Sequence, residues 1–187
     1  MSRIYRFAII GPESTGKSTL ARLLADHFQG EWAPEYAREY LTTHGKEYTI
    51  KDLQQIALGQ LALEDSRENH LRDSVLAGAA RPFLFTDTDM QVMRVWSEFV
   101  FDACDSLVLN AIVDRTYDGY LLCAPDVPWV KDLLREYPDH ATRNKLFHYY
   151  LDAMVNQSIP WIMIQGDYAA RVDSAISFVN SQIRQSE

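Results

Sequence analysis

The chain has 187 residues, of which 47% are apolar and 24% are charged. This length predicts one domain covering residues 1–187, with a core of ordinary size for a soluble protein. The net charge of −8 excludes a protein that wraps duplex nucleic acid, because such a surface would be basic. It does not exclude a small anionic ligand, since a local group of backbone amides can hold phosphate on an acidic protein.

No apolar run approaches the roughly 20 residues that are needed to cross a bilayer. The apolar segment 7–10 is also too short for a secretory signal. Cys104 and Cys123 lie in apolar contexts without metal-ligand spacing, which predicts buried, reduced thiols. We therefore expect a soluble, cytoplasmic protein with no membrane or nucleic-acid partner. The sequence leaves its oligomeric state open.

Apolar runs alternate with amphipathic stretches along the chain. The runs have the length of buried strands and lie at residues 4–10, 31–34, 83–85, 120–123 and 161–164. The amphipathic stretches predict helices from Lys17 to near Gly30, from a capping box at Thr49 and Asp52 through Leu71, at 90–101, at 107–113, at 128–155 with a break near Pro138, and from 167 through Ile183. Such alternation predicts an α/β fold with a five-stranded parallel sheet between two layers of helices.

The most specific motif in the chain is G-x-x-x-x-G-K-[ST], followed by a helix and preceded by a buried strand. Its glycines allow the backbone N–H groups to point toward phosphate oxygens, and the helix adds the positive end of its dipole. Lys17 can reach the β- and γ-phosphates, and the Ser18 hydroxyl can bind Mg²⁺. The motif therefore predicts a site for ATP with Mg²⁺, whose contact residues are Gly11, Glu13, Ser14, Thr15, Gly16, Lys17, Ser18 and Thr19.

Two acids follow the apolar run at 83–85. Asp87 stands at the carboxyl end of that strand, the edge at which ligands gather in open α/β sheets. We therefore expect Asp87 to share the Mg²⁺ site with Ser18. Asp89 can meet a substrate hydroxyl in the same cleft. The alternative is that both acids only cap the helix that follows.

Glu35 comes directly after the second strand, at the same edge of the predicted sheet. A kinase that acts on a hydroxyl needs a carboxylate near that hydroxyl to orient or deprotonate it. Glu35 and Asp89 are both candidates for this role, and the sequence does not separate them. Arg38, one helical turn later, either binds the substrate or pairs with nearby acids.

Residues 128–143 carry Arg135 and Arg143 on either side of Pro138, and we expect this segment to form a lid. In phosphoryl transfer, cations meet the charge that develops on the migrating group. Arginines on a mobile flap supply these cations on closure and exclude water. The alternative is a solvated helical hairpin with no part in the chemistry.

The segment 166–171 follows the last strand and can flank an adenine ring through Tyr168 or Arg171. Most aromatic side chains belong to the core, but one or two near the predicted loops can sandwich a flat base. The aromatic residues in that position are Tyr36, Tyr40, Trp96 and Trp129, of which Tyr36, Trp96 and Trp129 are candidate substrate contacts.

Six segments, in order along the chain, are similar to the ribosylnicotinamide kinase domain of NadR-like proteins, an ATPase and kinase family of the P-loop superfamily: residues 11–18, 35–39, 86–89, 95–98, 120–129 and 134–136. The resemblance implies a P-loop kinase fold and ATP-dependent phosphorylation of the 5′-hydroxyl of nicotinamide riboside to nicotinamide mononucleotide. It also implies that Arg135 and Arg143 are lid arginines. This chain has no room for the family's DNA-binding and adenylyltransferase domains, and Leu133 replaces a small or turn-forming residue of many members.

These observations favour an ATP-dependent kinase of a small molecule, with nicotinamide riboside as the implied acceptor. Another nucleoside or a nucleotide is an alternative acceptor, and a slow ATPase that acts as a nucleotide-dependent switch is the alternative class. A guanine-specific switch is excluded, because its Asn-Lys-x-Asp motif would need an acid at position 147, where the chain has Phe147. A mechanical AAA motor is not expected, since the chain is too short for the additional helical domain.

Overall fold

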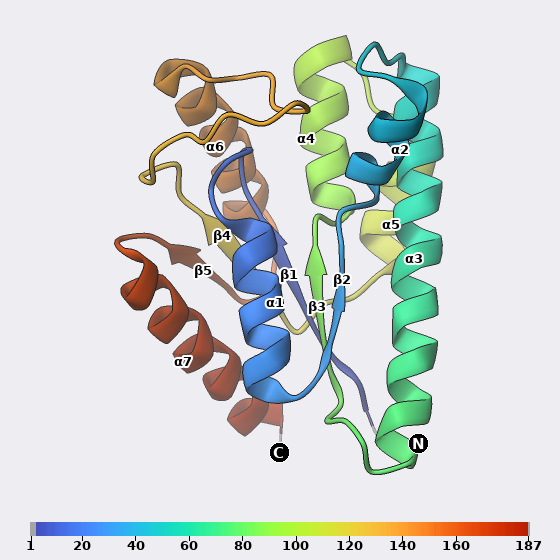
Figure 1. The fold of residues 1–187 in the computed structure, drawn as a ribbon, viewed down its shortest axis with the longest axis vertical. Helices are drawn as coiled ribbons and strands as arrows, with labels where there is room; N and C mark the ends of the chain where they lie inside the picture. The colour runs from blue at the N-terminus through green and yellow to red at the C-terminus, as the bar shows by residue number, and fades with distance from the viewer. Residues whose placement is uncertain (1–2, 187) are drawn as a thin grey trace.

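The chain folds around a parallel sheet of five strands in the computed structural model, which describes residues 3–186 (Figure 1). The strands are β1 (Tyr5–Ile10), β2 (Glu31–Ala33), β3 (Phe83–Asp87), β4 (Gly119–Cys123) and β5 (Trp161–Ile164). They lie in the order β2-β3-β1-β4-β5, and every neighbouring pair is parallel. The predicted five-stranded parallel sheet is thus confirmed.

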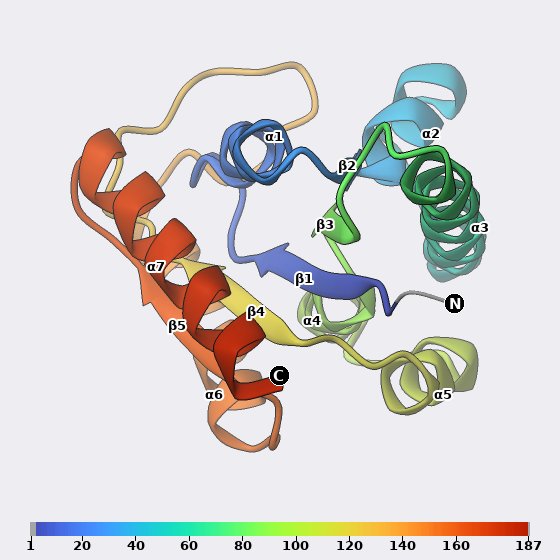
Figure 2. The ribbon, with the colours of Figure 1, turned by 90° about the horizontal axis from the view of Figure 1, so that it is seen from below.

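The helices are α1 (Lys17–Phe28), α2 (Tyr36–His44), α3 (Ile50–Leu76), α4 (Met90–Phe101), α5 (Ser106–Asp114), α6 (His140–Val155) and α7 (Tyr168–Ser186). Figure 2 shows α1 and α7 over one face of the sheet and α4 and α6 over the other. The predicted capping box starts α3, where Asp52 Oδ2 accepts the N–H of Thr49 at 2.8 Å. For helix α2 the sequence predicted no bounds, only that Arg38 lies one helical turn after Glu35.

The strands are apolar throughout because both faces of the sheet are covered. Phe7 and Ile9 of β1 pack under α1 and α7, whereas Ala8 and Ile10 point to the layer of α4 and α6. Phe28 of α1 packs on the ring of Phe85, which is fully buried. Truncation of a buried phenylalanine to alanine typically costs about 3–5 kcal/mol of folding free energy. This packing fixes α1, and with it the loop that precedes α1.

Residues 128–139 form a loop without regular structure, so the helix predicted for this part of 128–155 is wrong. The backbone N–H groups of Val130, Glu136 and Tyr137 bond to side chains of the loop between β1 and α1, and so make no helical bonds. Helix α6 begins only after Pro138, where Asp139 caps it by accepting the N–H of Thr142 at 2.7 Å.

Among residues 3–186 no helix is long and apolar enough to cross a membrane. Cys123 is buried, as expected, and burial raises the pKa of its thiol to about 12, which keeps the thiol protonated. Cys104 is only half-buried.

Candidate active site

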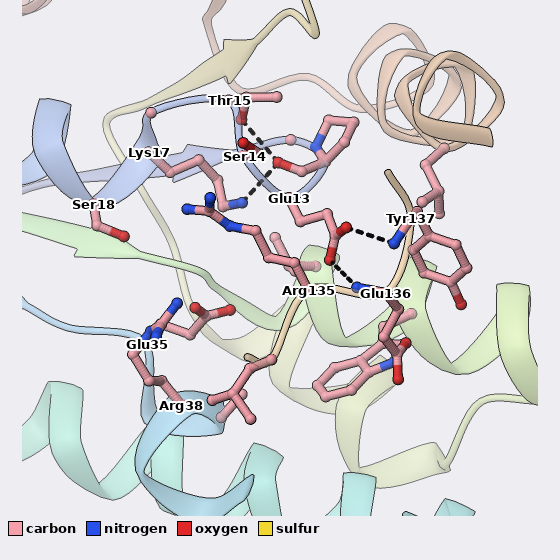
Figure 3. Close-up of a pocket in the computed structure, with 18 of the residues that line it drawn as sticks. Glu13, Ser14, Thr15, Lys17, Ser18, Glu35, Arg38, Arg135, Glu136 and Tyr137 are labelled. Atoms are coloured by element: carbon pink, nitrogen blue, oxygen red, sulfur yellow. Dashed lines mark hydrogen bonds between the residues drawn. The ribbon is translucent and has the colours of Figure 1, made fainter. Parts of the chain in front are cut away.

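A pocket of about 220 Å³ opens at the carboxyl ends of β1, β2 and β3 (Figure 3). Its wall consists of the β1–α1 loop, the start of α2, and residues from α4, α6 and the loop 128–139. Because β3 lies between β1 and β2, the side chains that follow β2 and β3 come to lie beside the β1–α1 loop. The sheet edge predicted from the sequence therefore holds the pocket.

The β1–α1 loop, residues 11–18, has the backbone that its glycines require. Gly11 has a φ of 133°, and a Cβ at this position would lie 2.6 Å from the carbonyl oxygen of Cys123. Gly16, with a φ of 83°, precedes α1 and gives its first turn no side-chain cap. The first N–H groups of α1 thus remain available to an anion. Lys17 Nζ donates to the carbonyl oxygen of Pro12 at 2.9 Å, across this phosphate loop.

Asp87 is the last residue of β3 and pairs in register with Ile9, two residues before the phosphate loop. The side chain is 1% exposed, and the Ser18 hydroxyl donates to it. Burial and the nearby Glu35 raise the pKa of Asp87 to about 6, while Lys17 and Ser18 act in the opposite direction. Its Oδ1 atom is buried and has no hydrogen-bond partner among the described residues. One carboxylate oxygen therefore remains for a ligand.

Glu35 lines the pocket at the N-terminal end of α2, and its side chain does not cap that helix. The amide group of Gln60, on α3, holds the backbone on both sides of Glu35. Gln60 Oε1 accepts the N–H of Tyr36 at 2.8 Å, and Gln60 Nε2 lies 3.3 Å from the carbonyl oxygen of Pro34. Gln60 is 1% exposed. Sequence reasoning missed this residue, although a glutamine on the apolar side of α3 was a visible signal.

Asp89 does not line the pocket. The buried carboxylate accepts the N–H groups of Gln91 (3.0 Å) and Val92 (3.3 Å) at the start of α4, and Tyr120 also donates to it. Burial raises the pKa of Asp89 to about 6 against these hydrogen bonds. These are the contacts of a helix cap, which is the alternative that the sequence left open. Of the two candidate bases, Glu35 alone faces the pocket.

The two predicted lid arginines occupy different environments. Arg135 lines the pocket, and Figure 3 shows its side chain extended toward the phosphate loop. Arg143 lies on α6, three residues before Leu146 and seven before Tyr150, which both line the pocket. It is 4% exposed, and its Nε and Nη1 atoms have no partner in the part of the chain that the structure describes.

Opposite the phosphate loop, the pocket is largely apolar. Trp96 forms part of this wall, and its Nε1 donates to the Tyr48 hydroxyl at 2.8 Å. Arg38 also lines the pocket and pairs with Asp132 of the loop 128–139 at 3.2 Å. Other wall residues, none of which was among the predicted site residues, are Leu41, Val92, Phe99, Leu134, Tyr137, Leu146 and Tyr150.

Asp87 and Arg143 also lie outside the pocket lining, as do three further predicted contacts. The ring of Tyr36 packs on Gly59, where an added Cβ would lie 2.0 Å from it. Trp129 points its Nε1 at Glu13 at 3.4 Å. Tyr168, the first residue of α7, is 59% exposed.

Arg171, the other candidate for an adenine contact, is buried and braces the phosphate loop. Its guanidinium donates to the carbonyl oxygens of Thr15 (3.0 Å) and Ala124 (2.8 Å) and pairs with Asp126. Its Nε also donates to the carbonyl oxygen of Gly166 at 3.0 Å. Arg171 therefore ties the phosphate loop to the ends of β4 and β5.

The strand order, the phosphate loop before α1 and the acid at the end of β3 define a P-loop protein with a kinase-like fold. A family model described as "AAA domain" matches residues 6–171. The chain therefore belongs to this family of P-loop domains. The match to this family model does not test the prediction that the chain is not a mechanical AAA motor.

The comparisons also confirm the resemblance to NadR-like proteins. The trifunctional NAD biosynthesis/regulator protein NadR of Salmonella typhimurium is 26% identical over 182 residues, which are 94% of this chain and 42% of that protein. The structure of a NadR protein in complex with NR superposes with a TM-score of 0.72 at 22% identity, over 96% of this chain and 49% of the other. A second structure, with NAD and AMP-PNP, gives 0.69 with the same identity and coverage. The chain thus spans less than half the length of these relatives.

The fold also occurs in proteins of the same size as this chain. Thymidylate kinase from Ehrlichia chaffeensis has a TM-score of 0.60 at 12% identity, over 94% of this chain and 99% of the other. The predicted three-layer P-loop kinase fold is therefore confirmed.

Proposed function

We propose that the protein is an ATP-dependent kinase of a small molecule, and that its acceptor is the 5′-hydroxyl of nicotinamide riboside. One observation carries the proposal: the pocket joins a phosphate loop on one side to an apolar, aromatic wall on the other. A protein that only binds and hydrolyses ATP has no need of the second half. A kinase needs it to hold the acceptor in line with the γ-phosphate.

The phosphate loop supplies the donor half. Unpaired N–H groups at the start of α1 and the Lys17 ammonium meet the phosphates. Ser18 and Asp87 suit Mg²⁺, because the spare Oδ1 of Asp87 is a hard oxygen ligand beside the hydroxyl. Among the described residues no group of three or more His, Cys, Asp or Glu forms a metal site. This agrees with an ion that takes few protein ligands and neutralises phosphate charge when bound.

Glu35 is the proposed base. It lines the pocket between the donor and acceptor halves, and Gln60 holds the backbone on both sides of it. A carboxylate in this place orients the acceptor hydroxyl and takes its proton as the phosphoryl group is transferred. The contacts of Asp89 favour a structural task instead.

Arg135 and Arg143 are the proposed cations for the transferring phosphoryl group. Arg135 reaches into the pocket from the loop 128–139. Arg143 keeps two buried nitrogen atoms without partners among the described residues, which is costly unless an anion binds them. Arginine suits this role because its planar fork of donors matches phosphate oxygens.

The acceptor is inferred from relatives. The NadR protein, which was solved in complex with NR, shares the fold over 96% of this chain. The apolar wall with Trp96, Phe99, Tyr137 and Tyr150 can take a flat aromatic base. Another nucleoside, or a nucleotide, fits the same description. Tyr168 remains a candidate contact for adenine.

The test is ADP release from Mg²⁺-ATP, measured with a panel of nucleosides that includes nicotinamide riboside and with no acceptor. We expect nicotinamide riboside to stimulate ADP release most. Stimulation by another nucleoside would keep the mechanism and replace the acceptor. Equal ADP release with and without every acceptor would instead support the slow ATPase switch.

A further inference from the structure

The loop 128–139, called the lid loop below, is attached to the phosphate loop through one side chain. The Glu13 carboxylate accepts the backbone N–H groups of Glu136 (2.9 Å) and Tyr137 (2.6 Å), one on each oxygen. The indole Nε1 of Trp129 also lies 3.4 Å from it. Figure 3 shows Glu13 pointing away from the Lys17 side chain and toward the lid loop. Glu13, although it belongs to the phosphate motif, therefore uses both carboxylate oxygens to bind the backbone of the lid loop.

These bonds bracket Arg135. Glu136 and Tyr137 follow it directly, so the Glu13 carboxylate fixes the backbone on its C-terminal side. On the other side, the Ser14 hydroxyl accepts the N–H of Val130 at 2.9 Å, and the Arg135 guanidinium donates to the Val130 carbonyl. Two consecutive residues of the phosphate loop therefore determine where Arg135 stands.

A carboxylate at this place has an electrostatic cost. It lies in the loop that we propose holds a triphosphate, and like charges repel each other. Two backbone N–H groups on an ionised carboxylate form charge-assisted hydrogen bonds, which are stronger than neutral ones. The hydrogen bonds that attach the lid loop offset the repulsion between the Glu13 carboxylate and the triphosphate.

We propose that Glu13 is the latch that holds the lid loop over the pocket and thereby positions Arg135 for catalysis. The catalytic role of Arg135 rests on the proposed kinase function, whereas the attachment of the lid loop by Glu13 does not. The same loop that binds the donor then also sets the closed state of the lid. Glu13 is a positioning residue, because its bonds go to the lid backbone.

Limited trypsin digestion tests the latch without any assay of activity. Lys131 and Arg135 lie in the lid loop, so cleavage after them, identified by mass spectrometry, reports its opening. In Glu13→Gln we expect these cleavages to run about tenfold faster than in the wild type, since one of two charge-assisted bonds is lost and the other is weakened. Glu39→Gln removes the same charge from an exposed site on α2 and should cleave as the wild type does.

Binding and turnover give a second, independent readout. Removal of a negative charge from the phosphate loop should leave the Kd for AMP-PNP unchanged or lower it. By contrast, kcat for transfer should fall about tenfold or more, because Arg135 is misplaced. Glu136→Pro removes one N–H from the lid side, together with the carboxylate that accepts from the Tyr48 hydroxyl. Because trypsin does not cleave Arg–Pro bonds, its readout is cleavage after Lys131, which should accelerate, and it covers the case in which Glu13→Gln does not fold.

Two results would overturn the latch. Unchanged cleavage together with weaker AMP-PNP binding would make Glu13 a part of the phosphate site alone. Unchanged cleavage with a raised KM for the acceptor would make it a substrate contact. If Glu13→Gln opens the lid loop but no nucleoside is phosphorylated by the wild type, the latch stands and the proposed function fails.

Discussion

At the scale of single residues, hydrogen bonds and one ion pair hold the polar groups of the pocket in place. Lys17 donates to the carbonyl oxygen of Pro12, Ser18 donates to Asp87, and Arg38 pairs with Asp132. Lys17, Ser18 and Asp87 are groups that the proposed phosphoryl transfer uses. The structure therefore holds the proposed catalytic groups near one another through bonds that a substrate can replace.

Lys17→Ala should remove most of the activity and leave the fold intact. We expect kcat to fall about 10²- to 10³-fold, the usual cost of losing one preorganised donor to the transition state. Lys17 makes one bond, to a neighbouring carbonyl, so the thermal midpoint should change little. Lys46→Ala, at an exposed loop position, is the matched control. Normal turnover by Lys17→Ala would show that the phosphate site is misassigned.

Glu35 and Asp89 can be separated by replacing each carboxylate with its amide. Glu35→Gln should lower kcat about 10²- to 10⁴-fold with little change in stability, as expected for a general base. Asp89→Asn should change kcat and stability little, because asparagine caps a helix about as well as aspartate, whereas Asp89→Ala should lower the free energy of unfolding by about 1 kcal/mol. Kinetics and urea unfolding of these variants decide the matter. The reverse pattern would make Asp89 the base.

At the scale of elements, α3 carries Gln60, which supports the backbone around Glu35 without lining the pocket itself. Gln60→Leu leaves the N–H of Tyr36 and the carbonyl of Pro34 without their partner. We expect a loss of about 1–3 kcal/mol in the free energy of unfolding and a raised KM for the acceptor, since Glu35 loses its support. Gln55→Leu, exposed on the same helix, should change neither quantity. Equal effects from both variants would show that the hydrogen bonds of Gln60 to Tyr36 and Pro34 have no special role.

The sequence predicted the regular elements well because their signals are local. Apolar runs defined all five strands, and Thr49 with Asp52 marked the start of α3. The lid loop was mistaken for a helix because its amides bond to Glu13 and Ser14, more than 110 residues away in the chain. No local pattern reports such a partner.

The site was predictable where a motif or a strand end fixes a residue. Lys17, Ser18, Asp87 and Glu35 come together at the edge where the sequence placed them. Asp89 lies only two residues after Asp87, yet at that position it caps α4. The aromatic wall arises from α4, α6 and the lid loop, and only tertiary packing brings these elements to one pocket.

At the scale of the whole molecule, a buried acid behind the site links stability to pH. Glu64 is 2% exposed, accepts from the Tyr117 hydroxyl at 2.9 Å and pairs with Arg115 at 3.3 Å. Burial raises its pKa from 4.5 to about 7, although Arg115 and Tyr117 oppose the shift. The folded state therefore keeps a proton that the unfolded state releases above about pH 4.5. This acid's contribution to stability falls as the pH rises from 4.5 to 7.

Glu64→Gln should remove that dependence. Between pH 5 and pH 8 the wild type should lose on the order of 2 kcal/mol more unfolding free energy than this variant, as measured by urea denaturation. Asp65→Asn changes an exposed acid that pairs with the same Arg115 and should keep the wild-type slope. If the slopes of the wild type and Glu64→Gln coincide, Glu64 is not protonated in the folded state.

On the proposed function, the protein transfers a phosphoryl group from ATP to a small acceptor. The most direct measurement is the product itself: ATP labelled at the γ-phosphate, Mg²⁺ and nicotinamide riboside are incubated with the protein, and the label is followed chromatographically. The proposed function predicts label in nicotinamide mononucleotide, at a rate that Lys17→Ala abolishes. Label found only in free phosphate, at the same rate without the riboside, would contradict it.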